Sequence, residues 1–269
     1  MRLHCLGTAG YHPGPERQTS CYFLPESGVL LDAGTGLFRL PPLIRGRELH
    51  VLISHAHLDH TVGLTFLVGM LGQGLIDRVS VWGQAEKLRA IREHLFHPLL
   101  FPAELQARWR AIDDLPRWAV GDCQVSWRPQ SHPGGSVAYR LDWRAGGRGD
   151  RGGAEGVARV AKSLVYATDT AGDHDEQTLR WMSSADLLMH ECNFVDSQRR
   201  WAQRTGHTWA GRVASVAAAT APRRLLLTHV NPTDESAVVD PGVVSRLAGL
   251  VGDAPLPVAV AHDGEVVDF

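Results

Sequence analysis

Short apolar runs bounded by glycine or proline open the chain, and longer segments with apolar residues three or four positions apart follow them. Runs of the first kind are typical of buried strands, and segments of the second kind are typical of helices with one buried face. The pattern predicts strands at 2–7, 20–25, 28–34, 49–55, 78–83, 123–132, 136–144, 162–170, 186–194 and 223–232, with a last strand pair in 257–269. It predicts helices at 61–74, 84–96, 175–185, 208–221 and 243–252, and a short helix between the prolines of 97–118.

The order of these elements favours one layered α/β domain. Strands dominate the first part of the chain, and strands alternate with helices afterwards, which is typical of layered α/β architectures. No internal repeat and no linker divides the sequence, so residues 1–269 are interpreted as a single domain. The glycine-rich segment 145–156 is predicted to be a hairpin tip, because it lacks the G-x-x-x-x-G-K pattern of a phosphate-binding loop.

Composition narrows the class of protein. With 44% hydrophobic and 21% charged residues, the chain has enough apolar side chains for a sizeable core. The 27 basic and 29 acidic residues give a net charge of −2, which argues against a dedicated nucleic-acid binder. No uninterrupted apolar run approaches the ~18 residues of a membrane span. The widely spaced Cys5, Cys21, Cys123 and Cys192 are predicted to be buried free thiols of a cytoplasmic protein.

Histidine is the unusual residue, with 14 copies, and three of them are crowded into one place. His55, His57 and His60 follow the predicted strand 49–55 together with Asp59. His55 and His57 are two positions apart in an extended segment, so their side chains can point the same way. Asp59 and His60 lie where a helix can begin, and one loop therefore offers four metal ligands to one place.

Further metal-capable residues stand at the ends of other predicted strands: His132, Asp169, His190 and His229. Sites in α/β sheets form at the carboxyl ends of strands. Each of these residues alone has an ordinary alternative, since a lone histidine often lies on the surface or in the core and a lone aspartate can cap a turn. Imidazole and carboxylate together suit Zn²⁺, and also Mn²⁺ or Fe²⁺. The cluster at 55–60 carries the prediction of a metal site.

The motif H-x-H-x-D-H at 55–60 resembles that of the metallo-β-lactamase fold family. Later segments match the family's motifs in order: "LLDAGTG" (30–36), "SHPGGS" with His132, "YATDT" with Asp169, "LLTHVNP" with His229, and the terminal "AHDGEVV". The resemblance spans nearly the whole chain. It implies an α/β fold in the form of a four-layer αββα sandwich, and a hydrolase that uses two divalent metal ions, zinc first among them.

The family's ligand roles extend to the matching positions of this chain. The resemblance implies that one ion is bound by His55, His57 and His132, and the second by Asp59, His60 and His229. Asp169 would bridge the two ions. Asp32 would orient the histidine loop from outside the coordination sphere, and His190 is a second residue expected near the ligands.

Two further segments resemble ribonuclease Z and its phosphodiesterase relatives: "MHECNF" (189–194) and "GHTWAGRVA" (206–214). This resemblance implies phosphodiester cleavage by a hydroxide held between the two ions, with Asp59 accepting a hydrogen bond from it. His207 is the candidate for the leaving-group side, and Glu191 is the candidate that orients His207. Arg199, Arg200 and Arg204 are candidates for phosphate binding, with a solvated basic face as the alternative.

The sequence also departs from ribonuclease Z. That enzyme binds tRNA with a protruding basic arm, and 145–156 is too short for one. Together with the charge balance, this favours a small or short nucleotide phosphodiester over long RNA. A homodimer is compatible with the resemblance, and residues 97–118 could form a lid or a dimer surface. The alternatives are a thioester, lactam or lactone hydrolase on the same metals, and a non-catalytic metal- or ligand-sensing module.

Overall fold

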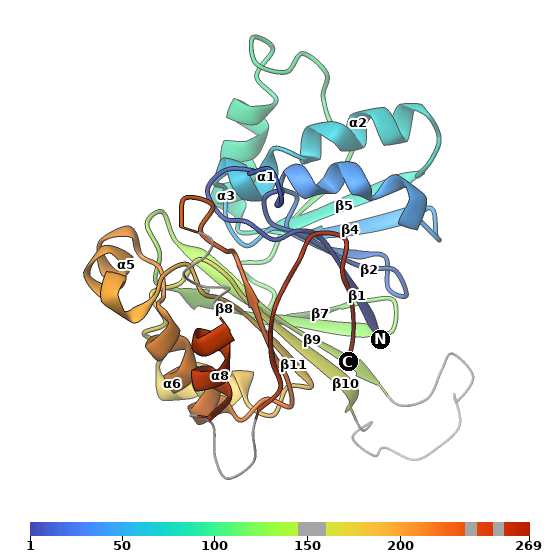
Figure 1. Cartoon of the computed structure of the whole chain (residues 1–269). Helices are drawn as coiled ribbons and strands as arrows, with labels where there is room; N and C mark the ends of the chain where they lie inside the picture. The colour runs from blue at the N-terminus through green and yellow to red at the C-terminus, as the bar shows by residue number, and fades with distance from the viewer. Residues whose placement is uncertain (145–159, 235–240, 250–255) are drawn as a thin grey trace, which may run out of the picture.

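Two seven-stranded β-sheets pack face to face, and helices cover their outer faces (Figure 1). The computed structural model of the chain describes residues 1–144, 160–234, 241–249 and 256–269. Within these residues, no helix is both long and apolar enough to span a bilayer. The four-layer α/β sandwich predicted from the sequence is confirmed.

The first sheet has the order β14-β1-β2-β3-β4-β5-β6. Neighbouring strands from β3 to β6 run parallel, so the carboxyl ends of β3 and β4 lie at the same edge. The strands are β1 (Arg2–Gly7), β2 (Cys21–Leu24), β3 (Val29–Leu31), β4 (Glu48–Leu52), β5 (Arg78–Gly83), β6 (Arg108–Ala111) and β14 (Val266–Asp268).

The second sheet has the order β13-β12-β11-β10-β9-β8-β7. Its strands from β10 to β13 are parallel neighbours, and β7 to β10 are antiparallel neighbours. The carboxyl ends of β8, β10, β11 and β12 therefore meet at one edge. The strands are β7 (Arg117–Val120), β8 (Cys123–Gln130), β9 (Ser136–Arg144), β10 (Val160–Ala167), β11 (Leu187–Glu191), β12 (Leu225–Thr228) and β13 (Val258–Val260).

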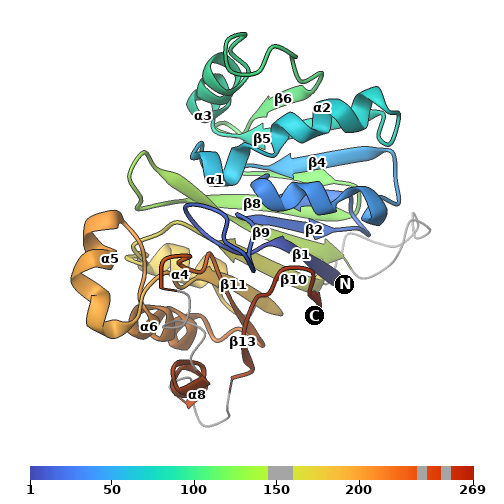
Figure 2. The ribbon, with the colours of Figure 1, turned by 45° about the horizontal axis from the view of Figure 1, so that its top comes forward.

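Helices form the two outer layers, as the tilted view shows (Figure 2). On the first sheet lie η1 (Thr35–Arg39), η2 (Pro41–Leu43), α1 (Leu58–Thr61), α2 (Leu64–Gly72), α3 (Ala85–Ala90) and the π-helical turn η3 (Ile91–Leu95). On the side of the second sheet lie α4 (Glu176–Met182), η4 (Asp196–Gln198), α5 (Arg199–Thr205), α6 (Ala210–Thr220) and α8 (Pro241–Gly249).

Three apolar clusters hold these layers together. The cluster between the sheets includes Tyr22 and Leu31 of the first sheet and Tyr139 and Tyr166 of the second. A second cluster packs the outer face of the first sheet against η1, α2 and α3, and a third packs the other sheet against α4, α6 and α8. Burial of apolar surface on both faces of both sheets explains why their strands read as continuous apolar runs. All four cysteines are buried free thiols, as predicted.

Some predicted elements differ from the structure. The short helix predicted within 97–118 is wrong: that segment contains β6, which extends the first sheet beside β5, and the start of β7. The helix predicted at 61–74 is divided into α1 and α2. The division falls at Gly63, where a Cβ atom would collide with the backbone of Ala33 and Gly34. The predicted tip 145–156 and the last residues of the helix predicted at 243–252 lie outside the described part of the chain.

A candidate metal centre between the two sheets

The loop after β4 forms the first side of the candidate centre. Asp32, directly after β3, fixes this loop because it accepts hydrogen bonds from the Ser54 amide at 2.7 Å and the Ser54 hydroxyl at 2.8 Å. The same carboxylate lies 2.7 Å from His60 Nδ1 and accepts a hydrogen bond from Tyr166 Oη at 2.8 Å. Asp32 is fully buried, so these contacts replace its lost hydration. They orient the four candidate ligands of the loop, His55, His57, Asp59 and His60.

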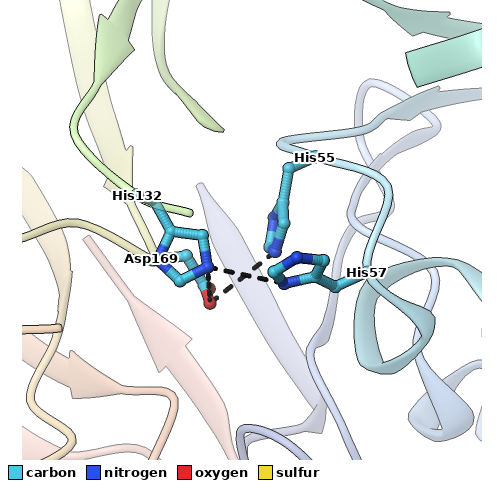
Figure 3. Close-up of side chains that lie close together, drawn as sticks. All are labelled: His55, His57, His132 and Asp169. Carbon is cyan, nitrogen blue, oxygen red and sulfur yellow. Dashed lines mark hydrogen bonds and ion pairs between the residues drawn. The ribbon is translucent and has the colours of Figure 1, made fainter. Parts of the chain in front are cut away.

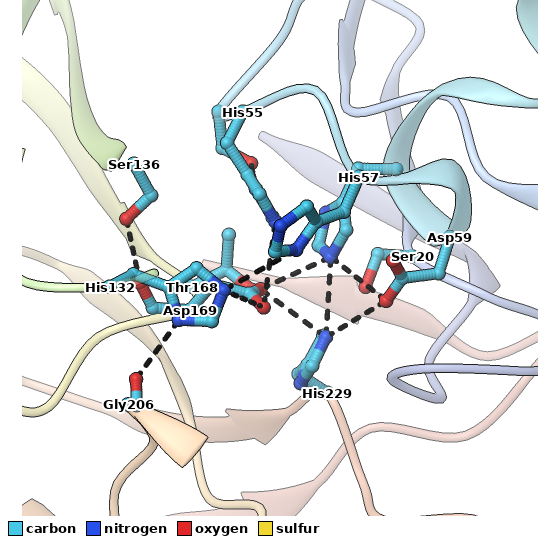
Figure 4. Close-up of polar contacts among 12 residues, drawn as sticks. Ser20, His55, His57, Asp59, His132, Ser136, Thr168, Asp169, Gly206 and His229 are labelled. Carbon is cyan, nitrogen blue, oxygen red and sulfur yellow. Dashed lines mark hydrogen bonds and ion pairs between the residues drawn. The ribbon is translucent and has the colours of Figure 1, made fainter. Parts of the chain in front are cut away.

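The second side comes from three separate strand ends of the other sheet. His132 follows β8, Asp169 follows β10 and His229 follows β12. Each is held locally: His132 Nδ1 lies 3.0 Å from the Gly206 carbonyl oxygen, and Thr168 Oγ1 donates to Asp169 Oδ2 at 2.7 Å (Figure 4). The polar network of Figure 4 therefore joins residues that are far apart in the chain.

All seven predicted ligands converge on one place. The ligands form two groups, and within each group the ligand atoms all lie within 4.8 Å of one another. One group is His55, His57, His132 and Asp169, and the other is Asp59, His60 and His229. Figure 3 shows the first of these groups. Asp169 faces both groups with different atoms. Its Oδ1 lies 3.5 Å from His132 Nε2 and 3.7 Å from His55 Nε2. Its Oδ2 lies 3.1 Å from His60 Nε2 and 3.2 Å from His229 Nε2.

The donor set fits two divalent metal ions. His55 Nε2 is buried and makes no hydrogen bond, although a buried polar atom normally has a partner. Imidazole nitrogens also approach each other closely, at 3.4 Å for His57 Nδ1 and His132 Nε2 and at 3.2 Å for His60 Nε2 and His229 Nε2. Metal ions bound to these nitrogens would account for both features, and the mixture of imidazole and carboxylate is suitable for zinc.

The electrostatics of the first group favour neutral imidazoles, the form that binds a metal. Burial lowers the pKa of His55 well below its usual value, and His60 lowers it further. Burial also lowers the pKa of His57 and of His132, against the opposite effect of Asp169.

The two carboxylates of the centre are ionised. Burial alone would raise the pKa of Asp59, but His60 and His229 hold the pKa well below its usual range by charge and hydrogen bonding. The pKa of Asp169 is likewise held well below its usual range, because His229, His60 and His55 outweigh its burial. Both carboxylates are thus favoured in the ionised form, which is the form that binds a metal.

The backbone is strained at several residues of this centre. Asp32, Asp169 and His229 have positive φ angles of 57°, 47° and 53°. A left-handed backbone costs a residue with a side chain about 1–2 kcal/mol, and such residues gather at functional sites. The fold thus maintains unfavourable backbone geometry where it presents these side chains.

His207 and Glu191 form a further pair at the edge of the cluster. His207 Nδ1 lies 3.0 Å from Glu191 Oε1, and the buried Glu191 also accepts hydrogen bonds from the amides of Thr170 at 2.8 Å and Thr208 at 3.2 Å. Burial would lower the pKa of His207, but the charge and hydrogen bond of Glu191 raise it to about 9. One ligand atom of His207 also lies within 4.8 Å of ligand atoms of Asp169 and His229. The pairing predicted from the sequence is thus present in the structure.

Other predicted residues lie elsewhere. His190 Nδ1 is 2.8 Å from the Glu191 carbonyl oxygen, and its ring lies beside His174 instead of the cluster. The guanidinium group of Arg199 lies 5.3 Å from the centre of the Trp209 ring, and that of Arg204 lies 5.0 Å from the centre of the Trp201 ring. Arg200 lies on α5 with them, and within the described residues it makes no ion pair.

The sequence did not reveal several residues that support the centre. Tyr166 and Ser54 contact Asp32, and Asn193 Nδ2 donates to the His229 carbonyl oxygen at 3.1 Å and lies 3.0 Å from Nδ1 of the same ring. Gly10 passes so close to the His229 ring that a Cβ atom there would collide with it. Their only signal is proximity to a motif, because a contact across the sheets has no periodic pattern.

The chain is similar to known proteins over most of its length. The chain matches the family of beta-lactamase superfamily domains over residues 28–230. Ribonuclease Z of Natronomonas pharaonis is 26% identical, with 100% of this chain and 98% of that protein covered. The crystal structure of human tRNase Z, short form, has a TM-score of 0.73 at 21% identity and covers 100% of this chain and 99% of that one. Zn²⁺-bound PqqB from Methylobacterium extorquens has a TM-score of 0.74 at 17% identity and covers 100% of both chains.

Proposed function

This chain belongs to the family of beta-lactamase superfamily domains, and from that premise we propose that it is a dinuclear-metal hydrolase of small or nucleotide-type phosphodiesters. One observation carries the choice of phosphodiesters. The His207–Glu191 pair stands beside Asp169 and His229, where a proton donor for a departing alkoxide is needed. The likeness to proteins named Ribonuclease Z supports the same bond class.

The ligand assignment is part of the proposal. His55, His57 and His132 would hold one ion, Asp59, His60 and His229 the other, and Asp169 both. Two ions bound there would activate a water molecule at neutral pH and neutralise the charge that develops on a phosphoryl group. Asp32 keeps the histidine loop in place through Ser54 and His60. Zinc is the proposed ion because of the donor set, and it is the ion bound in the fold neighbour PqqB.

The protein's own residues supply the proton chemistry. Because the pKa of His207 is raised to about 9, the ring is protonated on both nitrogens at neutral pH. Its Nδ1–H donates to Glu191 Oε1, and its Nε2–H is available to a departing oxygen. Glu191 fixes the ring, because three donors hold its carboxylate in place. The carboxylate of Asp59 receives the Tyr11 amide on Oδ2 at 2.8 Å and is positioned to accept a further hydrogen bond from the attacking water.

A small substrate is favoured by the even balance of 27 basic and 29 acidic residues. Structured RNA is the second candidate, supported by the name of the archaeal relative. We also propose a cytoplasmic location, since four buried free thiols fit a reducing compartment. A homodimer and a single domain over 1–269 remain predictions.

A paired assay on zinc-loaded protein tests the function. One substrate is bis(p-nitrophenyl) phosphate, and the others are a chromogenic β-lactam and a thioester. We expect preferential cleavage of the phosphodiester. Preferential cleavage of either acyl substrate would overturn the proposal and make the protein an acyl hydrolase.

The variant His207→Ala tests whether the His207–Glu191 pair supports phosphodiester cleavage. Loss of a general acid costs roughly 10²–10⁴-fold in rate, so we expect kcat on the phosphodiester to fall by about 10²-fold with the zinc content unchanged. Glu191→Gln is the matched variant, because it keeps the size of the side chain and removes its charge. Unchanged kcat in both variants would contradict the assigned role.

A further inference from the structure

The segment after β1 passes directly beside the candidate centre. Gly10 lies against the His229 ring, where no side chain would fit. The next residue, Tyr11, donates its backbone amide to Asp59 Oδ2 at 2.8 Å. The Cα atom of Tyr11 is one bond from that nitrogen, so its side chain begins within one hydrogen bond of a candidate ligand.

The backbone of Tyr11 is strained in the same way as that of the centre. Within the described residues, six non-glycine residues have positive φ angles: Tyr11, Asp32, Asp169, Ser184, Ala221 and His229. The positive φ angles of Asp32, Asp169 and His229 occur at residues that supply a candidate ligand or hold one by a hydrogen bond. Tyr11 has a φ of 60° and contacts the same centre, but its side chain has no role in the function proposed above. Strain of this kind is retained where the surrounding structure enforces it.

The ring of Tyr11 is exposed to solvent beside the candidate centre. The residue is 76% exposed, and its ring meets the His12 ring edge-on at 5.0 Å between centroids. Leu58, the residue before Asp59, is 67% exposed as well. Tyr11, whose amide contacts the Asp59 carboxylate, and Leu58, which precedes Asp59 in the chain, are therefore two large and exposed side chains next to the same ligand.

The segment that carries Tyr11 is firmly held. The buried guanidinium group of Arg17 donates to Thr8 Oγ1 at 2.6 Å and to the Ala261 carbonyl oxygen. The carboxylate of Asp263 accepts hydrogen bonds from the Gln18 amide at 2.6 Å and from Thr8 Oγ1 at 2.8 Å. Both ends of the segment are therefore fixed, and the amide bond to Asp59 holds the backbone of Tyr11 beside the centre.

We propose that Tyr11 is a substrate-binding residue whose ring stacks on a nucleobase carried by the phosphodiester. This inference rests on the function proposed above and narrows its substrate class to nucleoside-containing phosphodiesters. Every base has a π-face, and stacking on an aromatic side chain contributes about 1–3 kcal/mol per base. Leu58 would contact the sugar or the edge of the base.

The test compares two substrates with the same leaving group, thymidine 5′-(p-nitrophenyl phosphate) and methyl p-nitrophenyl phosphate, on zinc-loaded protein. The variant is Tyr11→Gly, which suits the positive φ and leaves the amide bond to Asp59 in place. We expect KM for the thymidine substrate to rise about tenfold and KM for the methyl substrate to change less than about twofold. Tyr11→Trp should restore the affinity. Phe38→Ala, at an exposed aromatic residue on η1, is the control and should change neither.

Binding is measured separately by calorimetry with thymidine 5′-monophosphate and methyl phosphate. A loss of about tenfold in affinity for the nucleotide alone supports the role of Tyr11, even if neither ester is cleaved. If nucleotide affinity falls in this way but neither ester is cleaved, the phosphodiesterase function is refuted and the nucleotide-binding role of Tyr11 still stands. Equal changes for both ligands, no change, or a shift of oligomeric state with no nucleotide preference would overturn the inference.

Discussion

The two sheets contribute to the candidate metal centre in different ways. The first sheet supplies four of the predicted ligands from the six consecutive residues His55–His60. The second supplies three, His132, Asp169 and His229, from the ends of three strands. One side depends on a local turn and the other on the parallel order of β10, β11 and β12. The ligands of the first side can be recognised in the sequence as a motif. Those of the second side come together only because the strands that precede them are neighbours in the sheet.

Direct contacts between the sheets make the two sides act as one site. Tyr166 in β10 donates to Asp32 after β3, and Tyr139 in β9 donates to the Ile53 carbonyl oxygen at 2.7 Å. The amide of Val137 donates to the Ser54 carbonyl oxygen at 3.0 Å. The first three substitutions below weaken one side or the link between them, and the fourth, at Arg204, changes neither. They follow in order of decreasing effect.

Asp169→Ala should have the largest effect, because Asp169 is the residue that faces both groups. We expect the phosphodiesterase rate to fall by more than about 10³-fold, beyond the loss of a single electrostatic contact. The number of bound zinc ions should also fall below that of the unaltered protein, as measured by elemental analysis after dialysis. Full zinc content in the variant would refute its bridging role.

Gly10→Ala should be the next most damaging, and its added Cβ atom would meet His229, a ligand from the second sheet. The added methyl group would collide with the His229 ring and displace it from Asp59 and His60. We expect kcat to fall by about 10²-fold, as for one lost electrostatic contact. Gly14→Ala is the matched control in the same segment, because nothing lies within 4 Å of a Cβ atom there. Equal rates for the two variants would contradict the close packing on His229.

Asp32→Asn should act on the side of the first sheet with a smaller effect. Asparagine keeps the shape and tolerates the positive φ, but it places an amide group where donors from Ser54 and Tyr166 now point. Loss of an outer-sphere partner typically costs 10–100-fold in metal affinity, so we expect the zinc Kd to rise about 30-fold in a chelator competition. An unchanged Kd would show that the loop holds its histidines without Asp32. Asp77→Asn, in an exposed ion pair with Arg47, is the control.

Arg204→Gln should have the smallest effect. The guanidinium group of Arg204 lies over the exposed ring of Trp201, and an exposed cation–π contact is worth about 0.5–1 kcal/mol. We expect KM for the phosphodiester to change less than about twofold. A fivefold or larger rise in KM, with Arg199→Gln unchanged, would restore the phosphate-binding role considered from the sequence.

The sequence predicted most strands because two-sided burial makes them apolar, and it predicted the ligands because they follow strand ends. It did not predict β6, whose residues Arg108–Ala111 are mostly exposed at the open edge of the first sheet and lack an apolar run. It also missed α5, a short helix with only Ala202 buried, which has no periodic apolar face to recognise.

The supporting residues of the site were harder still. The contact of Tyr166 with Asp32 joins positions 134 residues apart, and the strain at Tyr11 depends on packing against Asp59. Neither has a local signal in the sequence. Such contacts depend on how the two sheets face each other. They cannot be predicted from one sequence segment at a time.

The division of the centre between the sheets has a consequence for biosynthesis. His60 and His229 are separated by 169 residues, so at ~5–20 residues per second they leave the ribosome roughly 10–30 s apart. During that interval the His55–His60 loop is already made, while Asp169 or His229 is still absent. A metal ion captured then would be held by one peptide loop alone. Coordination by all seven proposed ligands would therefore become possible only after synthesis has passed β12.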